Sequence, residues 1–230
     1  MKSRFLLGVL CSAACLALAP AAHALTDPAG DFLSGYTGSR NGDLDVLSAS
    51  VSHDANAHLF DFTATLNAPV DTTASAFYVW GIDRGAGTEK FNTGAAPIGA
   101  GVKFDTVVIF RLDGTATIGS TVLHDVSWSG NTITGSVPDS LLPSMGLAFD
   151  DYGWNLWPRD GTVAGNAAIS DFAPDASDGA VTAVPEPASF AMLGAGLALM
   201  GATLRRRARC AGGPGERRRC LPSRRSQFPR

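Results

Sequence analysis

The segment from residue 25 to residue 183 lacks cysteine altogether and is poor in basic residues and glutamate. Its six basic residues face nineteen acidic ones, eighteen of them aspartate, so the segment carries a net charge of −13. The missing cysteines exclude disulfide bonds and thiol chemistry. With so few basic residues, the segment lacks the positively charged surface that nucleic-acid binding requires. All four cysteines of the 230-residue chain lie outside the segment, at Cys11, Cys15, Cys210 and Cys220.

Recognisable catalytic motifs are also missing. The segment has no His-Glu-x-x-His zinc pattern, no Gly-x-Ser-x-Gly nucleophile elbow and no glycine-rich phosphate loop. Asp150 and Asp151 are adjacent, so on a strand they would face opposite sides and could not act together as the paired carboxylates of a glycosidase. We therefore expect no enzyme activity. A secreted carbohydrate-active hydrolase with an unrecognised site is the alternative.

Helical periodicity is absent between residues 25 and 183, where no ten residues follow it cleanly. Short apolar alternations are separated by Gly, Asn and Asp instead, which is typical of β-strands joined by turns. Clear examples are 47–52 and 59–66, which should pair as an antiparallel hairpin, and 76–83, 105–112 and 147–157. The pattern predicts an all-β fold: a single antiparallel β-sandwich, jelly-roll or immunoglobulin-like, of about eight strands.

The N-terminus predicts export. Lys2 and Arg4 precede an apolar stretch at 5–18, and Ala22 and Ala24 frame a small-x-small cleavage site. This order is typical of a secretory signal peptide. We expect residues 1–24 to form a signal helix. The Sec machinery would recognise it during export of the protein, and signal peptidase would remove it.

The C-terminal part combines a proline motif, an uncharged run at 188–204 and an arginine cluster. Seventeen helical residues measure about 25 Å, the short end of what spans a hydrocarbon core. We therefore predict a transmembrane helix at 188–204 with its arginines in the cytoplasm; a buried core helix is the alternative. The flanking residues are Val184, Pro185, Glu186, Pro187, Arg205, Arg206 and Arg207.

This three-part order resembles the PEP-CTERM sorting signal of Gram-negative bacteria over residues 184–209. The resemblance implies export through the inner membrane and cleavage near Pro-Glu-Pro by an exosortase. It also implies a place at the cell surface or in the extracellular matrix, associated with exopolysaccharide and biofilm. A basic tail at 210–230 follows and is expected to be disordered. The chain is thus predicted to have four parts: the signal peptide at 1–24, the exported domain at 25–183, the sorting signal at 184–209 and the basic tail at 210–230.

A second, looser resemblance concerns the exported domain. Its marks are Asp27-Pro28-Ala29-Gly30-Asp31, Leu44-Asp45-Val46, Gly81-Ile82-Asp83, Val137-Pro138-x-x-Leu141 and the run Asp-Phe-Ala-Pro-Asp at 171–175. This order is similar to carbohydrate-binding modules and DOMON-like β-sandwiches of exported bacterial proteins. The resemblance implies a sandwich fold and carbohydrate binding.

Two groups of residues are candidate binding sites. Asp27, Asp31, Asp43 and Asp45 lie at short, irregular spacing in a glycine-rich lead-in, which suits calcium, a cation bound by oxygen ligands. Plain turn and cap roles are the alternative. Tyr152, Trp154 and Trp157 form a candidate platform for stacking on sugars, with a role in the core as the alternative.

The function expected from these features is non-catalytic. The chain is predicted to be an exosortase-sorted surface or matrix protein that associates with polysaccharide, and a purely structural matrix protein is a further alternative.

Overall fold

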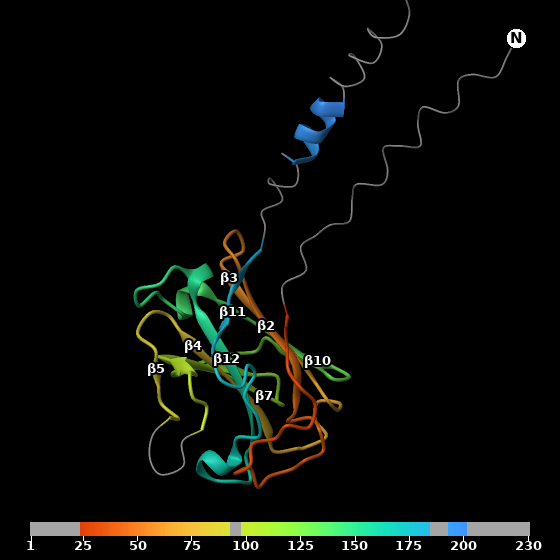
Figure 1. Cartoon of the computed structure of the whole chain (residues 1–230), viewed down its shortest axis with the longest axis vertical. Coiled ribbons are helices and arrows are strands. Elements are labelled where there is room, and N and C mark those ends of the chain that lie inside the picture. Colours follow the sequence, from red (N-terminus) through yellow and green to blue (C-terminus); the bar gives the residue numbers. More distant parts are fainter. Residues whose placement is uncertain (1–23, 93–97, 185–192, 202–230) are drawn as a thin grey trace, which may run out of the picture. The chain divides into compact units, whose positions relative to one another are not determined.

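The apolar alternations form two six-stranded sheets in the computed structural model, which describes residues 24–92, 98–184 and 193–201 (Figure 1). The first sheet has the order β1-β2-β3-β11-β10, and β14 also pairs with β2. Its strands are β1 (Leu25–Thr26), β2 (Val46–Asp54), β3 (Leu59–Leu66), β10 (Val126–Ser129), β11 (Thr132–Pro138) and β14 (Thr182–Ala183). All of these pairs are antiparallel except β14 with β2, which is parallel.

The second sheet has the order β13-β12-β4-β7-β8-β9 and is antiparallel throughout. Its strands are β4 (Ala76–Asp83), β7 (Thr106–Arg111), β8 (Ala116–Ile118), β9 (Thr121–Leu123), β12 (Gly153–Asp160) and β13 (Gly179–Ala180). A short pair, β5 (Thr88–Glu89) with β6 (Lys103–Phe104), lies apart from both sheets in the hydrogen-bonding pattern. Short 3₁₀ turns lie between β11 and β12, at Asp139–Leu141 and Phe149–Asp151, and between β12 and β13, at Gly165–Ala168.

One hydrophobic core is shared by the two sheets. On β2, β3 and β11 buried residues alternate with half-buried ones, so each of these strands turns one face inward. Phe62 of β3 contacts rings of the second sheet, with its centroid 5.3 Å from that of Trp80 and 5.8 Å from that of Phe110. The prediction of an all-β fold is confirmed to the extent that the described chain is mostly β, with sheets of antiparallel strands and one helix at 193–201.

The other face of the second sheet is covered by a smaller apolar cluster. Trp157, Val79 and Phe104 belong to it, together with Phe172 from the C-terminal segment. Because the sheet is covered on both faces, β4 and β12 are buried almost continuously instead of in alternation.

The chain divides into two units, residues 1–185 and 186–230, and both sheets belong to the first. The second unit is described only at 193–201, which is helical. No helix among the described residues has the length and apolar character that crossing a membrane requires. The predicted segment 188–204 extends beyond 193–201 at both ends, and the predicted signal helix lies outside the described residues apart from Ala24.

Candidate functional site

Five aspartates from both ends of the folded unit converge beside the start of β2. Their carboxylate oxygens form two groups, each with its oxygens within 4.8 Å of one another, and Asp31 belongs to both. The first group is Asp27, Asp31 and Asp175, and the second is Asp31, Asp45 and Asp171. Such a set of oxygens from separate loops is the kind of donor set that hard divalent cations take.

The N-terminal lead-in positions three of these side chains. Asp27 directly follows β1, and its N–H donates to the carbonyl of Leu47 over 2.9 Å. Gly30 has a φ of 82°, a left-handed conformation that favours glycine, and its N–H donates to Oδ2 of Asp45 over 2.8 Å. The amide of Asn67 donates to the same oxygen over 2.8 Å, so Asp45 is held firmly at the entrance to β2.

The C-terminal segment supplies the other two side chains. Asp171 is fully buried, and its Oδ2 accepts the N–H of Val46 over 3.0 Å while its Oδ1 accepts the N–H of Phe172 over 2.7 Å. Asp175 is exposed at the rim of the cluster. The second group therefore lies beneath the first, with Asp31 between them.

The cluster brings five carboxyl groups together without a basic partner among the described residues. No salt bridge in the described part of the chain involves any of its five members. Burial raises the pKa of Asp27, and repulsion from Asp171 and Asp175 raises it further. Burial also raises the pKa of Asp171, against the opposing effect of the hydrogen bond from Val46. Desolvation raises the pKa of Asp31 as well. The folded chain thus holds these carboxylates where ionisation is unfavourable unless a cation compensates it.

Several oxygens of the cluster are buried without any hydrogen-bond partner. These are Oδ2 of Asp27, Oδ1 of Asp31 and Oδ1 of Asp45. Asp45 is only 1% exposed, so water does not reach its free oxygen from the surface. A buried acceptor without a partner costs about 1–3 kcal/mol, and more when it is charged.

Asp43 does not join the cluster, which corrects one of the four residues predicted from the sequence. Its two carboxylate oxygens accept the N–H and the hydroxyl of Thr73, over 2.6 Å and 2.7 Å. Its own carbonyl accepts the hydroxyl of Tyr78 over 3.0 Å. Asp43 therefore has a structural role as a hydrogen-bond acceptor. Such a turn or cap role was the alternative to calcium binding for the four predicted aspartates.

Asp171 and Asp175 belong to the cluster although the four residues predicted from the sequence do not include them. They bracket the Asp-Phe-Ala-Pro-Asp run at 171–175, which resembles the lead-in Asp27-Pro28-Ala29-Gly30-Asp31 in having an aspartate at each end of five residues. That repeated spacing is the signal that could have linked the two ends.

The predicted sugar platform is wrong, because its three rings are buried. Tyr152, Trp154 and Trp157 are 0%, 1% and 2% exposed. Tyr152 and Trp154 belong to the shared core, and Trp157 belongs to the cluster on the opposite face of the same sheet. Their apolar area is used for packing, so none of them presents a face to a ligand.

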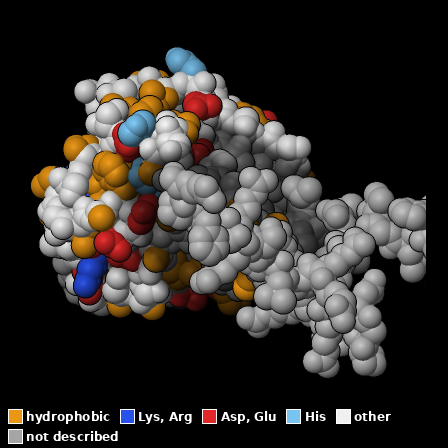
Figure 2. Space-filling view, turned by 90° about the horizontal axis from the view of Figure 1, so that it is seen from above, with side chains coloured by type: hydrophobic (Ala, Val, Ile, Leu, Met, Phe, Trp, Pro, Cys, Tyr) orange, Lys and Arg blue, Asp and Glu red, His pale blue; other side chains and the backbone are white. Residues whose placement is uncertain are grey.

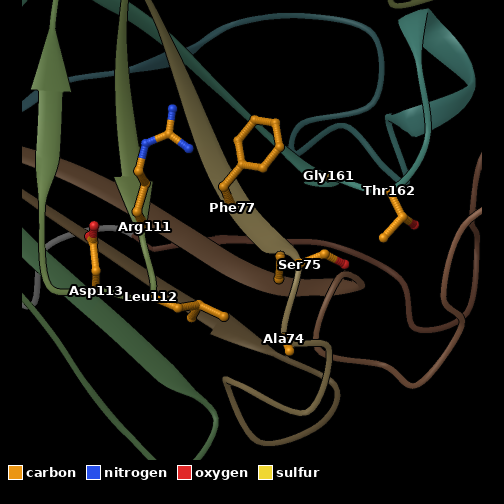
Figure 3. A pocket seen from close by; sticks show the side chains of 9 residues that line it. Ala74, Ser75, Phe77, Arg111, Leu112, Asp113, Gly161 and Thr162 are labelled. Carbon is orange, nitrogen blue, oxygen red and sulfur yellow. The ribbon is translucent and has the colours of Figure 1, made fainter.

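A shallow cavity of about 470 Å³ lies elsewhere on the domain, at the ends of β4 and β7 (Figure 3). Its lining includes Phe77, Arg111 and Asp113, and the Arg111 guanidinium carbon lies 5.5 Å from the Phe77 ring centroid. Asp113 is its only acidic lining residue, and Oδ1 of Asp113 already accepts from Thr115. The cavity therefore has no pair of carboxylates of the kind that glycoside hydrolysis requires.

The domain surface is acidic outside the cluster as well. On the face shown in Figure 2, acidic side chains are dispersed among polar and apolar ones, while basic side chains are confined to one edge. This distribution agrees with the net charge of the segment.

The folded domain leads directly into the predicted sorting signal. Ala183 of β14 pairs with His53 of β2, and the N–H of Val184 donates to the His53 carbonyl over 2.9 Å. Val184, the first residue of the predicted signal, is therefore hydrogen-bonded to the sheet. The remaining predicted signal residues, Pro185 to Pro187 and Arg205 to Arg207, lie outside the described ranges, as does Ala22.

Comparison with known proteins identifies the C-terminal signal. No curated protein and no solved structure matches the chain, so the similarity of the domain to DOMON-like and carbohydrate-binding sandwiches stays a prediction. Residues 183–207 match the family model of the PEP-CTERM protein-sorting motif. This match supports an exported bacterial protein that an exosortase sorts to the cell surface.

Proposed function

We propose that this chain is a non-catalytic surface or matrix protein whose folded domain, residues 25–183, is released near Pro185-Glu186-Pro187 and then associates with exopolysaccharide. The observation that carries the proposal is the PEP-CTERM match at 183–207. The domain is proposed to be a β-sandwich formed by the two sheets around their shared core.

The position of the match relative to the fold supports processing at this point. The last strand, β14, ends at Ala183, where the matched motif begins. Cleavage after this strand would leave every strand of both sheets in the released part. The domain would thus keep its complete core after processing.

Two observations favour a binding or matrix role over hydrolysis. The cavity beside Phe77 lacks paired carboxylates, and in the aspartate cluster Asp45 and Asp171 are buried and accept backbone N–H groups. The acidic domain surface also suits a protein that stays soluble at high local concentration in an extracellular matrix.

Mass spectrometry of the exported protein tests the sorting step. In cells that contain the cognate exosortase, the mature protein should end near Pro187 and lack peptides from 188–209. The Glu186→Ala variant should accumulate at full length in the membrane fraction. Glu216→Ala, which removes the same side chain beyond the motif, should be processed like the wild type.

Intact exported protein carrying residues 188–209 would contradict exosortase processing. Association with polysaccharide is tested separately, by comparing the share of the protein in the matrix fraction with and without exopolysaccharide synthesis. An unchanged share would leave a purely structural surface role in place of polysaccharide association.

A further inference from the structure

We propose that the five-aspartate cluster of Asp27, Asp31, Asp45, Asp171 and Asp175 is a calcium site that fastens the N-terminal lead-in of the domain to its C-terminal segment. The two oxygen groups, each within 4.8 Å, share Asp31, which places this residue at the centre of the site.

Other aspartates of the same domain show what a purely structural role looks like. Oδ1 of Asp54 accepts the N–H groups of Asn56 and Ala57, and Oδ1 of Asp113 accepts the N–H and hydroxyl of Thr115. Asp160 uses both of its oxygens on neighbouring hydroxyl and N–H groups. These side chains act as turn acceptors within reach of their donors.

The cluster differs because its free oxygens are buried and point to no donor. Asp45 is 1% exposed, with Oδ2 bonded to two donors and Oδ1 to none. Asp31 Oδ1 and Asp27 Oδ2 are also buried without a partner. Turn formation leaves these oxygens unexplained, whereas calcium bound at the two oxygen groups that share Asp31 would give each of them a partner.

The chemistry of the donors selects calcium among common divalent cations. The cluster offers carboxylate oxygens only, without the imidazole or thiolate ligands that zinc and copper prefer. Calcium takes six to eight oxygens in flexible geometry, which suits carboxylates contributed by two segments that are far apart in the sequence. Magnesium demands a near-ideal octahedron and retains several waters, which suits a crowded, half-buried carboxylate set poorly.

Hydrogen bonds on the outer side of the cluster orient it for such an ion. The N–H groups of Gly30 and Val46 hold Asp45 and Asp171, respectively, and leave the other members free to approach the cation. Outer partners of this kind fix the direction of metal ligands in known sites.

A bound ion would connect the N-terminal and C-terminal segments of the domain. Asp27 and Asp31 come from the segment next to β1, and Asp171 and Asp175 come from the segment that returns to β14. Both terminal strands pair with β2, and Figure 1 shows the two ends of the fold beside this strand. Calcium would thus fasten the lead-in to the returning segment at the start of β2, whereas β14 pairs with Ser52 and His53 near the end of that strand.

Thermal unfolding of the exported protein at constant ionic strength tests the site. Calcium chloride should raise the melting temperature relative to chelator by about 5–10 °C at a hundredfold excess over Kd. Magnesium chloride should produce a much smaller shift. Asp31→Asn should abolish the calcium shift, whereas Asp125→Asn, which removes an exposed charge outside the cluster, should keep it.

The behaviour of Asp31→Asn in chelator separates an ion site from a structural role. Without the ion, this variant should melt above the wild type, because it loses repulsion among the clustered carboxylates. If Asp31 instead stabilises the fold by itself, Asp31→Asn should melt below the wild type in chelator. That result would overturn the proposal. Equal shifts with calcium, magnesium and sodium chloride would also overturn it, because they would reflect screening of the acidic surface.

Hydrogen exchange provides a second readout that does not depend on global unfolding. Chelator should accelerate exchange of the N–H groups of Asp27 and Leu33 and of Val46 and Ala173, which are hydrogen-bonded around the cluster. Exchange in β7 and β8 should stay unchanged. Equal protection around the cluster with calcium and with chelator would contradict a calcium link between the two ends.

Discussion

Asp178 shows at the scale of one residue how burial and charge set the pH response of the domain. Burial, together with repulsion from Asp83, raises the pKa of this side chain to about 6, although the N–H of Lys103 donates to both carboxylate oxygens. The folded state therefore binds a proton more tightly than the unfolded state does. Its free energy of unfolding falls as the pH rises from about 4 to about 6, and the loss persists above that range.

Replacing Asp178 by asparagine should remove this loss, because the amide oxygen still accepts from Lys103 without carrying charge. At pH 7 we expect Asp178→Asn to be more stable than the wild type by about 1 kcal/mol, a value reduced for solvent screening. The difference should shrink toward pH 4. Urea unfolding of both proteins across this range measures it.

Asp113→Asn is the matched control with the opposite sign. The pKa of the exposed Asp113 carboxyl is lowered because Thr115 donates to it from its hydroxyl and its N–H. Its stabilising effect is present above pH 4 and is lost in acid, so this variant should be less stable than the wild type at pH 7. A less stable Asp178→Asn at pH 7 would mean that the Lys103 bond outweighs the burial of charge.

At the scale of elements, the long strands follow the sequence pattern closely and the short ones do not. The predicted strand at 76–83 coincides with β4, and the predicted hairpin of 47–52 with 59–66 is the antiparallel pair β2–β3. β1, β5, β6, β13 and β14 have two residues each, too few to show any alternation. Their positions depend on which strand they pair with, and the local sequence does not contain that information.

The strand expected at 147–157 begins later in the chain because tertiary contacts hold residues 149–151 in a turn. Phe149–Asp151 form a 3₁₀ turn, and β12 runs from Gly153 to Asp160 instead. The turn places the Phe149 ring 4.9 Å from the His53 ring and Asp150 Oδ1 3.0 Å from His53 Nδ1. His53 is consequently buried.

Close contact between β4 and β12 depends on a glycine. A Cβ atom at Gly81 would collide with the Trp157 ring and lie 3.2 Å from Cβ of Phe104. Trp157 is itself fixed by neighbouring rings, with its centroid 4.9 Å from that of Phe104. We therefore expect Gly81→Ala to lower the free energy of unfolding by about 1–3 kcal/mol.

Gly35→Ala controls for the change of residue type, because a Cβ atom there meets nothing within 4 Å and no left-handed backbone is required. Its effect should stay within about 0.5 kcal/mol. Denaturant unfolding curves compare the two variants. Equal effects would mean that the second apolar cluster adapts to an extra methyl group.

At the scale of the whole molecule, the sequence predicts the aspartate cluster only in part. Asp27, Asp31 and Asp45 are close in sequence, and their spacing was enough to single them out. Asp171 and Asp175 reach them only because the chain returns after β12, where the N–H of Leu33 donates to Ser170 and the N–H of Val46 donates to Asp171. Such long-range placement follows from strand order, which a pattern of alternation does not specify.

The exported domain should fold without help from covalent links. All four cysteines lie outside residues 25–183, whereas the shared core lies entirely within them. Residues 25–183 alone should therefore be soluble and give a β-dominated circular dichroism spectrum that a reducing agent does not change. The Trp80 and Trp154 rings are 5.8 Å apart, so their coupled signal should disappear together with the strand signal in one cooperative transition. A helical spectrum, or a tryptophan signal lost before the strand signal, would contradict one core shared by both sheets.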